Sequence, residues 1–239
     1  MKPTRGGAGR ALWGWASSSP DQRETDVTKP AARDRAGARA AAESRQTLLL
    51  PLLFEQVDEQ RPLVVLDVGA GVAETVEFFS RFRCRLHFAD LFDAPQLSAP
   101  PGDDAEAYFA EVFAELCDFG AETRFDICLL WDFPNYLPLP ALRAFSAALR
   151  PFLHRDTRGH GFGAFKASAP AMAGNTPEVP LQFGIDNTDQ LVVRPRSTGL
   201  ATRYSHSRAV LADVFSCFEI ARGTLLRDGA MELLLHTRY

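Results

Sequence analysis

The residues best suited to chemistry stand at positions 67–71, Asp-Val-Gly-Ala-Gly, directly after a β-branched apolar run that begins at Val64. An apolar run of this kind predicts a buried parallel strand. Two glycines spaced one apart predict a sharp turn from the strand into a helix, because they leave the main chain open to a ligand and tolerate dihedral angles that a Cβ atom disfavours. The sequence therefore predicts a nucleotide-binding turn with a carboxylate, Asp67, at its start.

A second carboxylate, Asp90, ends the next predicted strand, residues 85–90, about 20 residues beyond the glycines. In open α/β sheets, ligands bind at the carboxyl ends of the strands, so Asp67 and Asp90 are expected at one crevice. A carboxylate in the second position accepts hydrogen bonds from both ribose hydroxyls of a nucleoside. A solvated loop acid or a helix cap is the other interpretation of Asp90.

The run Asp67-x-Gly69-x-Gly71-x-Ala73 resembles motif I of the class I S-adenosylmethionine-dependent methyltransferases, with Ala73 in place of the last glycine of that motif. A dinucleotide-binding turn, G-x-G-x-x-G, would have a small residue where this chain has Glu74. A carboxylate such as Asp67 attracts the ammonium group of S-adenosylmethionine and would repel a pyrophosphate. The resemblance implies S-adenosylmethionine as cofactor. The binding residues that it implies are Asp67, Gly69, Ala70, Gly71, Asp90, Leu91, Asp118, Phe119 and Trp131.

The elements around this turn are predicted from apolar periodicity. Residues 36–59 have helical spacing, interrupted by Pro51, and residues 74–82 predict a short helix. Residues 103–119 predict another helix, capped by Asp103 or Asp104, which leads almost directly into a strand at residues 125–131. The third strand that the resemblance implies is therefore missing, very short or hidden in residues 116–120. Only Asp118 and Phe119 stand where the family contacts adenine.

The segment 132–136, Asp-Phe-Pro-Asn-Tyr, follows the strand at 125–131 and gathers polar and aromatic groups at a strand end. It departs from the Asp-Pro-Pro-Tyr motif of the amino-methylating enzymes, so it is not assigned to that motif. We expect Asp132 to position the acceptor and Tyr136 to act beside it, with His206, near a helix start, as a further catalytic candidate. An aromatic plug followed by a helix cap is the other interpretation.

A helix at residues 140–153 precedes an Arg-rich loop with His154 and His160, and then a predicted strand at residues 161–166. An insertion at residues 168–204 contains a plausible hairpin, 181–185 with 191–194, and is expected to lie over the pocket as a lid or an acceptor-recognition segment. Its arginines are candidates for binding an anionic group of the acceptor or for a solvated basic loop. They are Arg194, Arg196 and Arg203.

The C-terminal residues 217–222 and 231–236 predict two strands joined by about eight residues, too few for a parallel crossover. They are expected to pair antiparallel, and a last strand reversed into an otherwise parallel sheet resembles the methyltransferase domain. The predicted fold is an α/β, Rossmann-like three-layer sandwich over residues 41–239, with a mostly parallel sheet and an antiparallel C-terminal strand.

Composition bounds the remaining possibilities. The chain has 239 residues, 46% of them hydrophobic, enough for one domain after a leader, residues 1–40, whose composition predicts disorder. Its net charge is −4, and the first 45 residues carry +4, so the acidic remainder argues against a nucleic-acid groove. The longest apolar run, residues 48–54, is too short to cross a bilayer, and we expect a cytoplasmic location.

The four cysteines are scattered and predict reduced core thiols without a metal site. Trp13 and Trp15 in the leader could anchor a protein partner or could be incidental aromatics.

Three functional hypotheses follow from these patterns. The first is methyl transfer from S-adenosylmethionine to an acceptor that is a small molecule rather than a nucleic acid. The second is a binding scaffold of the same fold without catalysis, which Ala73 and the compressed third strand favour. The third is an NAD(P)-dependent oxidoreductase, which Asp67 and Glu74 disfavour.

Overall fold

A computed structural model describes residues 42–55, 57, 61–98, 102–163, 176–197, 199–227 and 229–238. The leader, with Trp13 and Trp15, lies outside these residues, so its predicted disorder and partner stay predictions. The strands are β1 (Glu43–Gln46), β2 (Leu63–Asp67), β3 (Cys84–Phe88), β4 (Phe125–Trp131), β5 (Leu153–Gly163), β6 (Thr176–Glu178), β7 (Leu181–Asn187), β8 (Gln190–Pro195), β9 (Ala201–Arg203), β10 (Phe218–Leu225) and β11 (Met231–Thr237). The helices are α2 (Leu50–Phe54), α3 (Ala73–Phe79), α4 (Ala105–Leu116), α5 (Leu139–Leu149) and α6 (Arg208–Val214), with short 3-10 helices η1 (Leu91–Asp93), η2 (Pro95–Leu97), η3 (Phe133–Tyr136) and η4 (Arg150–Phe152).

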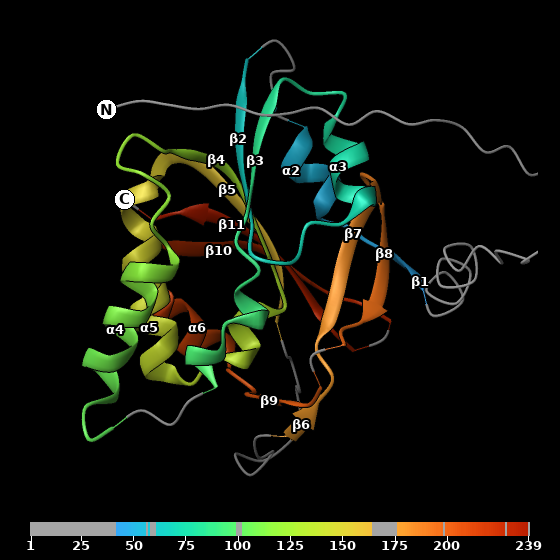
Figure 1. The fold of residues 1–239 in the computed structure, drawn as a ribbon. Coiled ribbons are helices and arrows are strands. Elements are labelled where there is room, and N and C mark those ends of the chain that lie inside the picture. Colours follow the sequence, from blue (N-terminus) through green and yellow to red (C-terminus); the bar gives the residue numbers. More distant parts are fainter. Residues whose placement is uncertain are drawn as a thin grey trace, which may run out of the picture.

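A six-stranded sheet with the order β10-β11-β5-β4-β2-β3 forms the centre of the fold. Strands β3, β2, β4 and β5 are parallel, whereas β11 runs antiparallel to both β5 and β10. Helices α4, α5 and α6 lie on one face, and α2, α3, β7 and β8 lie on the other (Figure 1). The predicted three-layer α/β fold and its reversed C-terminal strand are confirmed.

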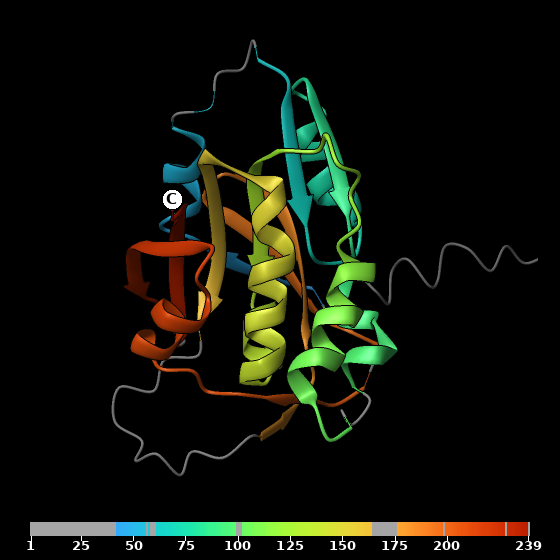
Figure 2. The same cartoon turned by 90° about the vertical axis from the view of Figure 1, so that its left-hand side faces the viewer.

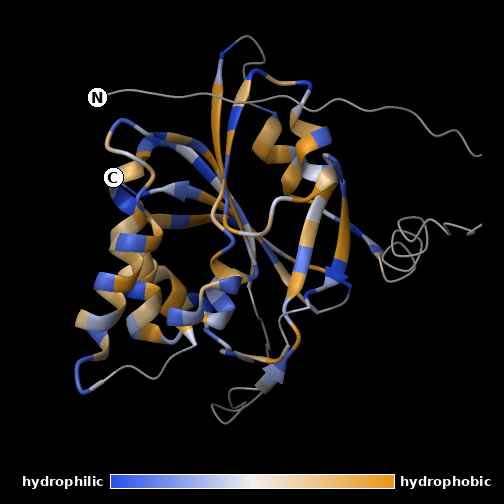
Figure 3. Ribbon diagram, viewed as in Figure 1, coloured by the Kyte–Doolittle hydropathy of each residue, from blue (hydrophilic) through white to orange (hydrophobic). Residues whose placement is uncertain are grey.

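The central strands are apolar because both of their faces are covered. Every residue of β4 except Asp126 is buried, and Figure 3 shows β2 as predominantly apolar. On the α4 side, the predicted Asp104 cap is confirmed, since its carboxylate accepts a hydrogen bond from the Ala107 amide at 3.0 Å. Helices α4 and α5 lie side by side along the sheet in both views (Figure 2).

No strand lies between β3 and β4 in the part of the chain that the structure describes. The segment from Leu91 to Leu97 instead forms η1 and η2, and α4 then leads through a turn to Phe125. Residues 116–120, one of the places considered for the usual third strand, form the end of α4 and the turn after it. Strand β3 therefore remains the edge of the main sheet.

The insertion forms two small sheets. The predicted hairpin is confirmed as β7 and β8, and β1 pairs antiparallel with β8 to complete a three-stranded sheet in the order β1-β8-β7. Strands β6 and β9 form a separate antiparallel pair. The prediction of helical structure across residues 36–59 is wrong for Glu43–Gln46, because these residues add a strand to the free edge of β8. Among the described residues of this range, only α2 is helical.

The boundary predicted for the fifth strand is also wrong. Residues Leu153–Gly163 form β5, so the segment expected to be an Arg-rich loop is a strand between β4 and β11. The polar residues of this segment hide the apolar pattern of a buried strand, because two of the buried positions hold polar side chains with hydrogen-bond partners. Thr157 donates a hydrogen bond to the Phe125 carbonyl at 2.6 Å, and His160 Nε2 lies 2.8 Å from Glu232 Oε1.

Glu232 on β11 joins the insertion sheet and α2 to the main sheet. Its fully buried carboxylate accepts hydrogen bonds from the amides of Leu48, Leu49 and Leu50 at 2.7, 3.0 and 3.2 Å. Burial alone would raise the pKa of Glu232, but the contact with His160 and the amide hydrogen bonds outweigh it and lower the pKa. This carboxylate supplies the acceptor for the orphaned amides at the start of α2.

The four cysteines are free, and three of them are buried. Among the described residues, no helix is long and apolar enough to cross a membrane.

We predict that Glu232→Gln lowers the free energy of unfolding by about 2–4 kcal/mol, because a side-chain amide offers one acceptor oxygen to four donors and directs its own N–H groups at some of them. Urea unfolding monitored by circular dichroism measures the change. Glu219→Gln, on the exposed face of neighbouring β10, is the matched control and should change stability by less than about 0.5 kcal/mol. Equal stability of the two variants would contradict the role of Glu232.

Candidate functional site

The turn after β2 is built around the carboxylate of Asp67, which is 1% exposed. Its Oδ1 accepts hydrogen bonds from the Gly69 amide at 2.8 Å and from Trp131 Nε1 at 2.6 Å. Its Oδ2 is buried and has no hydrogen-bond partner among the described residues. Burial raises the pKa of Asp67 to about 7, although the two hydrogen bonds oppose this shift.

The glycines of the turn are needed for close packing. A Cβ atom on Gly69 would lie 3.1 Å from Asp67 Oδ1 and 3.3 Å from Trp131 Cδ1, and one on Gly71 would lie 3.3 Å from the ring of Phe88. Neither glycine has a positive φ, so the expectation that the turn requires dihedral angles special to glycine is wrong. The chain's own aromatic rings lie against the main chain that was expected to be open to a ligand.

Trp131 ends β4 and closes one side of the crevice. Its φ is 49°, an unusual value for a bulky residue, and its indole is buried beside Asp67. The indole stacks on the ring of Phe183 in β7, with centroids 5.2 Å apart and planes 6° apart. The Ile185 amide of β7 also donates a hydrogen bond to the Thr75 hydroxyl of α3, at 3.2 Å. The insertion is therefore fastened over the turn by a ring stack and by a main-chain contact.

Asp90 follows β3 in the left-handed region, with φ 33° and ψ 54°. Main-chain hydrogen bonds from Asp90 to Gly69 and from Leu91 to Val68, at 3.3 and 2.9 Å, bring the ends of β3 and β2 together. The predicted juxtaposition of Asp67 and Asp90 is thus present. The charge of Asp90 also contributes to raising the pKa of Asp67, after the larger effect of burial.

The carboxylate of Asp90 forms an ion pair with Arg196, which follows β8. The Arg196 side chain is only 5% exposed, and its guanidinium carbon lies 4.8 Å from the ring centroid of Phe92. Its Nε and Nη1 atoms are buried and lack hydrogen-bond partners in the described part of the chain. The Asp90 carboxylate, which was expected to bind a ribose, is therefore engaged in an ion pair with Arg196.

The other two arginines of the insertion are paired in the same way. Arg194 forms an ion pair with Glu74 at the start of α3, and Arg203 forms one with Glu178 across the β6–β9 pair at 2.8 Å. The interpretation of these three arginines as a solvated basic loop is wrong, because acids of the same chain hold all of them.

At the end of β4, Asp132 and Tyr136 form a second polar group. Asp132 is buried, its Oδ1 has no partner among the described residues, and its Oδ2 accepts a hydrogen bond from the Tyr136 hydroxyl at 3.4 Å. Burial raises the pKa of Asp132 to about 7, against the lowering effect of the charge on Arg203. Burial and the nearby Asp132 charge raise the pKa of Tyr136, which keeps this phenol protonated.

A cavity of about 440 Å³ lies beside Tyr136. It is bounded by the segment after β3, by η3, and by Pro180 and β9 of the insertion. Its lining residues are Leu91, Phe92, Ala94, Leu97, Ser98, Phe109, Phe133, Tyr136, Leu137, Pro138, Pro180, Leu200, Ala201, Thr202 and Tyr204.

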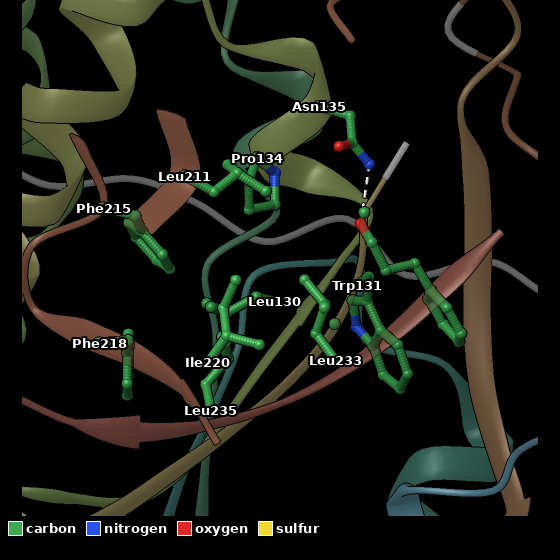
Figure 4. A pocket seen from close by; sticks show the side chains of 13 residues that line it. Leu130, Trp131, Pro134, Asn135, Leu211, Phe215, Phe218, Ile220, Leu233 and Leu235 are labelled. Atoms are coloured by element: carbon green, nitrogen blue, oxygen red, sulfur yellow. Dashed lines mark hydrogen bonds between the residues drawn. The ribbon is translucent and has the colours of Figure 1, made fainter. Parts of the chain in front are cut away.

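A second void lies among β4, β5, α6 and the C-terminal hairpin. Figure 4 shows apolar side chains gathered around it and the Asn135 amide donating a hydrogen bond to the Phe162 carbonyl, at 2.8 Å. Its volume is about 30 Å³, close to that of one water molecule, so it is a packing gap and not a ligand site.

The structure does not bring Asp118 and Phe119 to this crevice. Phe119 packs on Phe125, the first residue of β4, with ring centroids 5.0 Å apart, whereas the crevice lies at the other end of that strand. With no third strand to carry the chain across the sheet, the segment after α4 stays at the amino end of β4.

His206 is also held by the main chain. Its Nε2 donates a hydrogen bond to the Leu137 carbonyl at 2.8 Å, and burial lowers its pKa. Of the predicted residues, those near Asp67 and Asp90 form one crevice, and Asp132 and Tyr136 form a second group. No sequence pattern pointed to Phe183 as a covering residue, and Arg196 was predicted only as a candidate for contacting an anion. Within the described ranges no cluster of three or more His, Cys, Asp or Glu side chains could hold a metal ion.

No protein-family model matches this chain, and no curated protein matches it. Several solved methyltransferase structures are among those found to be similar to it. A 1,6-didemethyltoxoflavin-N1-methyltransferase of Burkholderia thailandensis is 16% identical, with 88% of this chain and 82% of that chain covered and a TM-score of 0.45. The glycopeptide N-methyltransferase MtfA is 14% identical, with 89% and 100% covered and a TM-score of 0.44.

Proposed function

We propose that this chain binds S-adenosylmethionine at the ends of β2 and β3 and transfers its methyl group to a small-molecule acceptor. The observation that carries the proposal is the pair of carboxylates, Asp67 and Asp90, at neighbouring ends of parallel strands. Asp67 Oδ2 is a buried acceptor without a partner among the described residues, which is costly in free energy. An ammonium group placed against it would satisfy this oxygen.

The residues present fit the polar groups of this cofactor. Asp67 would hold the ammonium of its amino-acid end, Asp90 would accept hydrogen bonds from the ribose hydroxyls, and Leu91 would contact the adenine ring. When bound, the cofactor supplies a methyl group on a positively charged sulfur. The chain contributes binding and orientation, because a displacement of this kind depends chiefly on the placement of donor and acceptor.

The crevice is closed by the chain itself in the described arrangement. Trp131 and Phe183 cover the turn at Gly69, and Arg196 holds Asp90. Entry of a nucleoside therefore requires β7 and β8 to move away from the strand ends, so we assign the insertion the role of a lid. Arg196 must release Asp90 during that movement, because the guanidinium and the ribose hydroxyls would compete for the same carboxylate oxygen.

The second candidate function is a binding scaffold without catalysis. The specific observation in its favour is the same stack of Trp131 on Phe183, which fills the place of a ligand with protein. The oxidoreductase is disfavoured, because Glu74 places a negative charge in the first turn of α3, where a pyrophosphate would bind.

Calorimetric titration with S-adenosylmethionine, S-adenosylhomocysteine and NADH tests the three functions. Binding of the first two without NADH supports the proposal. If none of the three compounds produces heat, only the scaffold function remains. Binding of NADH alone would favour the oxidoreductase function.

Asp90→Asn is predicted to weaken S-adenosylhomocysteine binding at least about tenfold, because hydrogen bonds to a charged group contribute about 1.5–3 kcal/mol. Asparagine tolerates the left-handed conformation of this position and has nearly the same volume. Calorimetry measures the dissociation constant. Asp93→Asn, exposed and three residues further along the chain, is the control, and equal affinities of the two variants would remove Asp90 from the site.

Arg196→Ala is predicted to strengthen S-adenosylhomocysteine binding about tenfold, since loss of a competing ion pair worth about 1.4 kcal/mol would free the Asp90 carboxylate. The control is Arg194→Ala, which removes the arginine two residues earlier but leaves Asp90 paired. Weaker binding by Arg196→Ala than by the control would show that this arginine contacts the cofactor and does not compete with it.

The pH dependence of binding follows from Asp67. Its pKa of about 7 means that the carboxylate gains a proton as the pH falls from 8 to 6, and a neutral carboxyl no longer attracts an ammonium group. The affinity for S-adenosylhomocysteine should therefore fall severalfold over this interval in the unaltered chain. Asp67→Asn, which keeps the acceptor for Gly69 and Trp131, should bind weakly at both pH values, and a steep pH profile in this variant would contradict the assignment.

A further inference from the structure

The cavity beside η3 has the properties of an acceptor site. Resting on the methyltransferase function above, we propose that it binds a flat, uncharged aromatic acceptor with an O–H or N–H group, and that Tyr136 and Asp132 carry away the proton which methylation releases.

The size and lining of the cavity define the class of acceptor. Its volume of about 440 Å³ falls within the range of small-molecule sites. Five of its lining residues are aromatic, and the ring of Phe92 meets the rings of Phe133 and Tyr136 edge-on, at 5.1 and 5.7 Å between centroids. Rings in such arrangements favour another aromatic ring as ligand. No described lining residue is charged, so a phosphate or carboxylate group of an acceptor would find no counter-ion in the cavity wall itself.

The position of the cavity connects it to the cofactor crevice. Leu91, which follows Asp90 directly, lines the cavity, and Phe92 lies between the cavity and the guanidinium of Arg196. The far wall belongs to the insertion, through Pro180 and β9. The carbonyl of Pro180 also accepts a hydrogen bond from the Arg196 amide, at 2.8 Å. Acceptor and cofactor would therefore meet beneath one movable segment.

The proton has a defined route. As the acceptor oxygen or nitrogen forms its bond to the methyl carbon, the sulfur–carbon bond breaks and its electron pair stays on sulfur. The acceptor must then lose one proton. This proton passes to the Tyr136 oxygen, and the hydroxyl proton of Tyr136 passes to Asp132 Oδ2, 3.4 Å away.

The surroundings of Asp132 support its role as the final proton acceptor. Its pKa of about 7 leaves a fraction of it ionised near neutral pH, and its Oδ1 is buried without a partner among the described residues. The charged groups that act on it are Arg203 and Arg45, which favour the ionised form, and Glu178 pairs with Arg203. A buried carboxylate of this kind is suited to accept a proton at neutral pH.

Equilibrium dialysis with 7-hydroxycoumarin and its ether, 7-methoxycoumarin, tests the proposal on the full chain. Both probes are flat, but only the first can donate a proton to Tyr136. The unaltered chain should bind 7-hydroxycoumarin about tenfold more tightly than the ether. Tyr136→Phe keeps the ring and should reduce this preference to less than about twofold, whereas Tyr108→Phe, whose hydroxyl binds the Gln96 carbonyl, should retain it.

A second pair of variants tests the cavity itself. Ala201→Trp places an indole in the cavity wall on β9 and should abolish binding of both coumarins, whereas Ala221→Trp, exposed on β10, should not. Unchanged melting temperatures establish that the variants are folded. Full binding by Ala201→Trp would overturn the site, and an intact preference in Tyr136→Phe would overturn the proton route.

Titration with S-adenosylhomocysteine on the same proteins separates this proposal from the function on which it rests. A chain that binds S-adenosylhomocysteine but neither coumarin would overturn only the acceptor class. A chain that binds the coumarins but not S-adenosylhomocysteine would overturn methyl transfer and leave an aromatic-binding protein.

Discussion

The burial of the Asp67 carboxylate is the constraint around which the crevice is arranged. A buried carboxylate must be protonated or supplied with hydrogen-bond donors. In this chain the donors are the Gly69 amide and the indole of Trp131. The indole reaches Asp67 from a residue with φ 49°, a conformation that a bulky side chain adopts at a cost. Phe183 of the insertion then stacks on the indole. The hydrogen bond that Asp67 receives from Trp131 therefore also influences where the insertion lies.

Acids outside the insertion also hold its strand β8 and the arginine that follows this strand. Arg194 is paired with Glu74 and Arg196 with Asp90, while Glu232 fixes the start of α2 next to β1. These attachments differ in kind. The Glu232 carboxylate is fully buried and binds main-chain amides, whereas each of the two arginine pairs includes a carboxylate that is partly accessible to water. The insertion is therefore anchored firmly at β1 and more weakly at the mouth of the crevice, where a ligand would enter.

The sequence predicted the parts of the fold that depend on neighbouring residues. Strands β2 and β4 consist mainly of apolar residues, and a short connection determined the antiparallel pairing of β10 and β11. Strand β1 was missed because it pairs with β8, about 150 residues later, and no local periodicity records such a partner. In the site, Asp67 and Asp90 followed from their spacing, but the contacts of Arg196 and Phe183 depend on how a distant hairpin lies over them. Asp118 and Phe119 were misplaced because a family pattern was extended across a strand that this segment does not form.

Trp131 is the only tryptophan beyond residue 15. Its indole is enclosed between a carboxylate and a phenylalanine ring at the point where the insertion meets the strand ends. An indole in such surroundings emits at shorter wavelengths than one in contact with water, and it responds to a neighbouring charge. The residue that closes the crevice thereby gives the chain an intrinsic optical reporter of whether the crevice is open, without any added label.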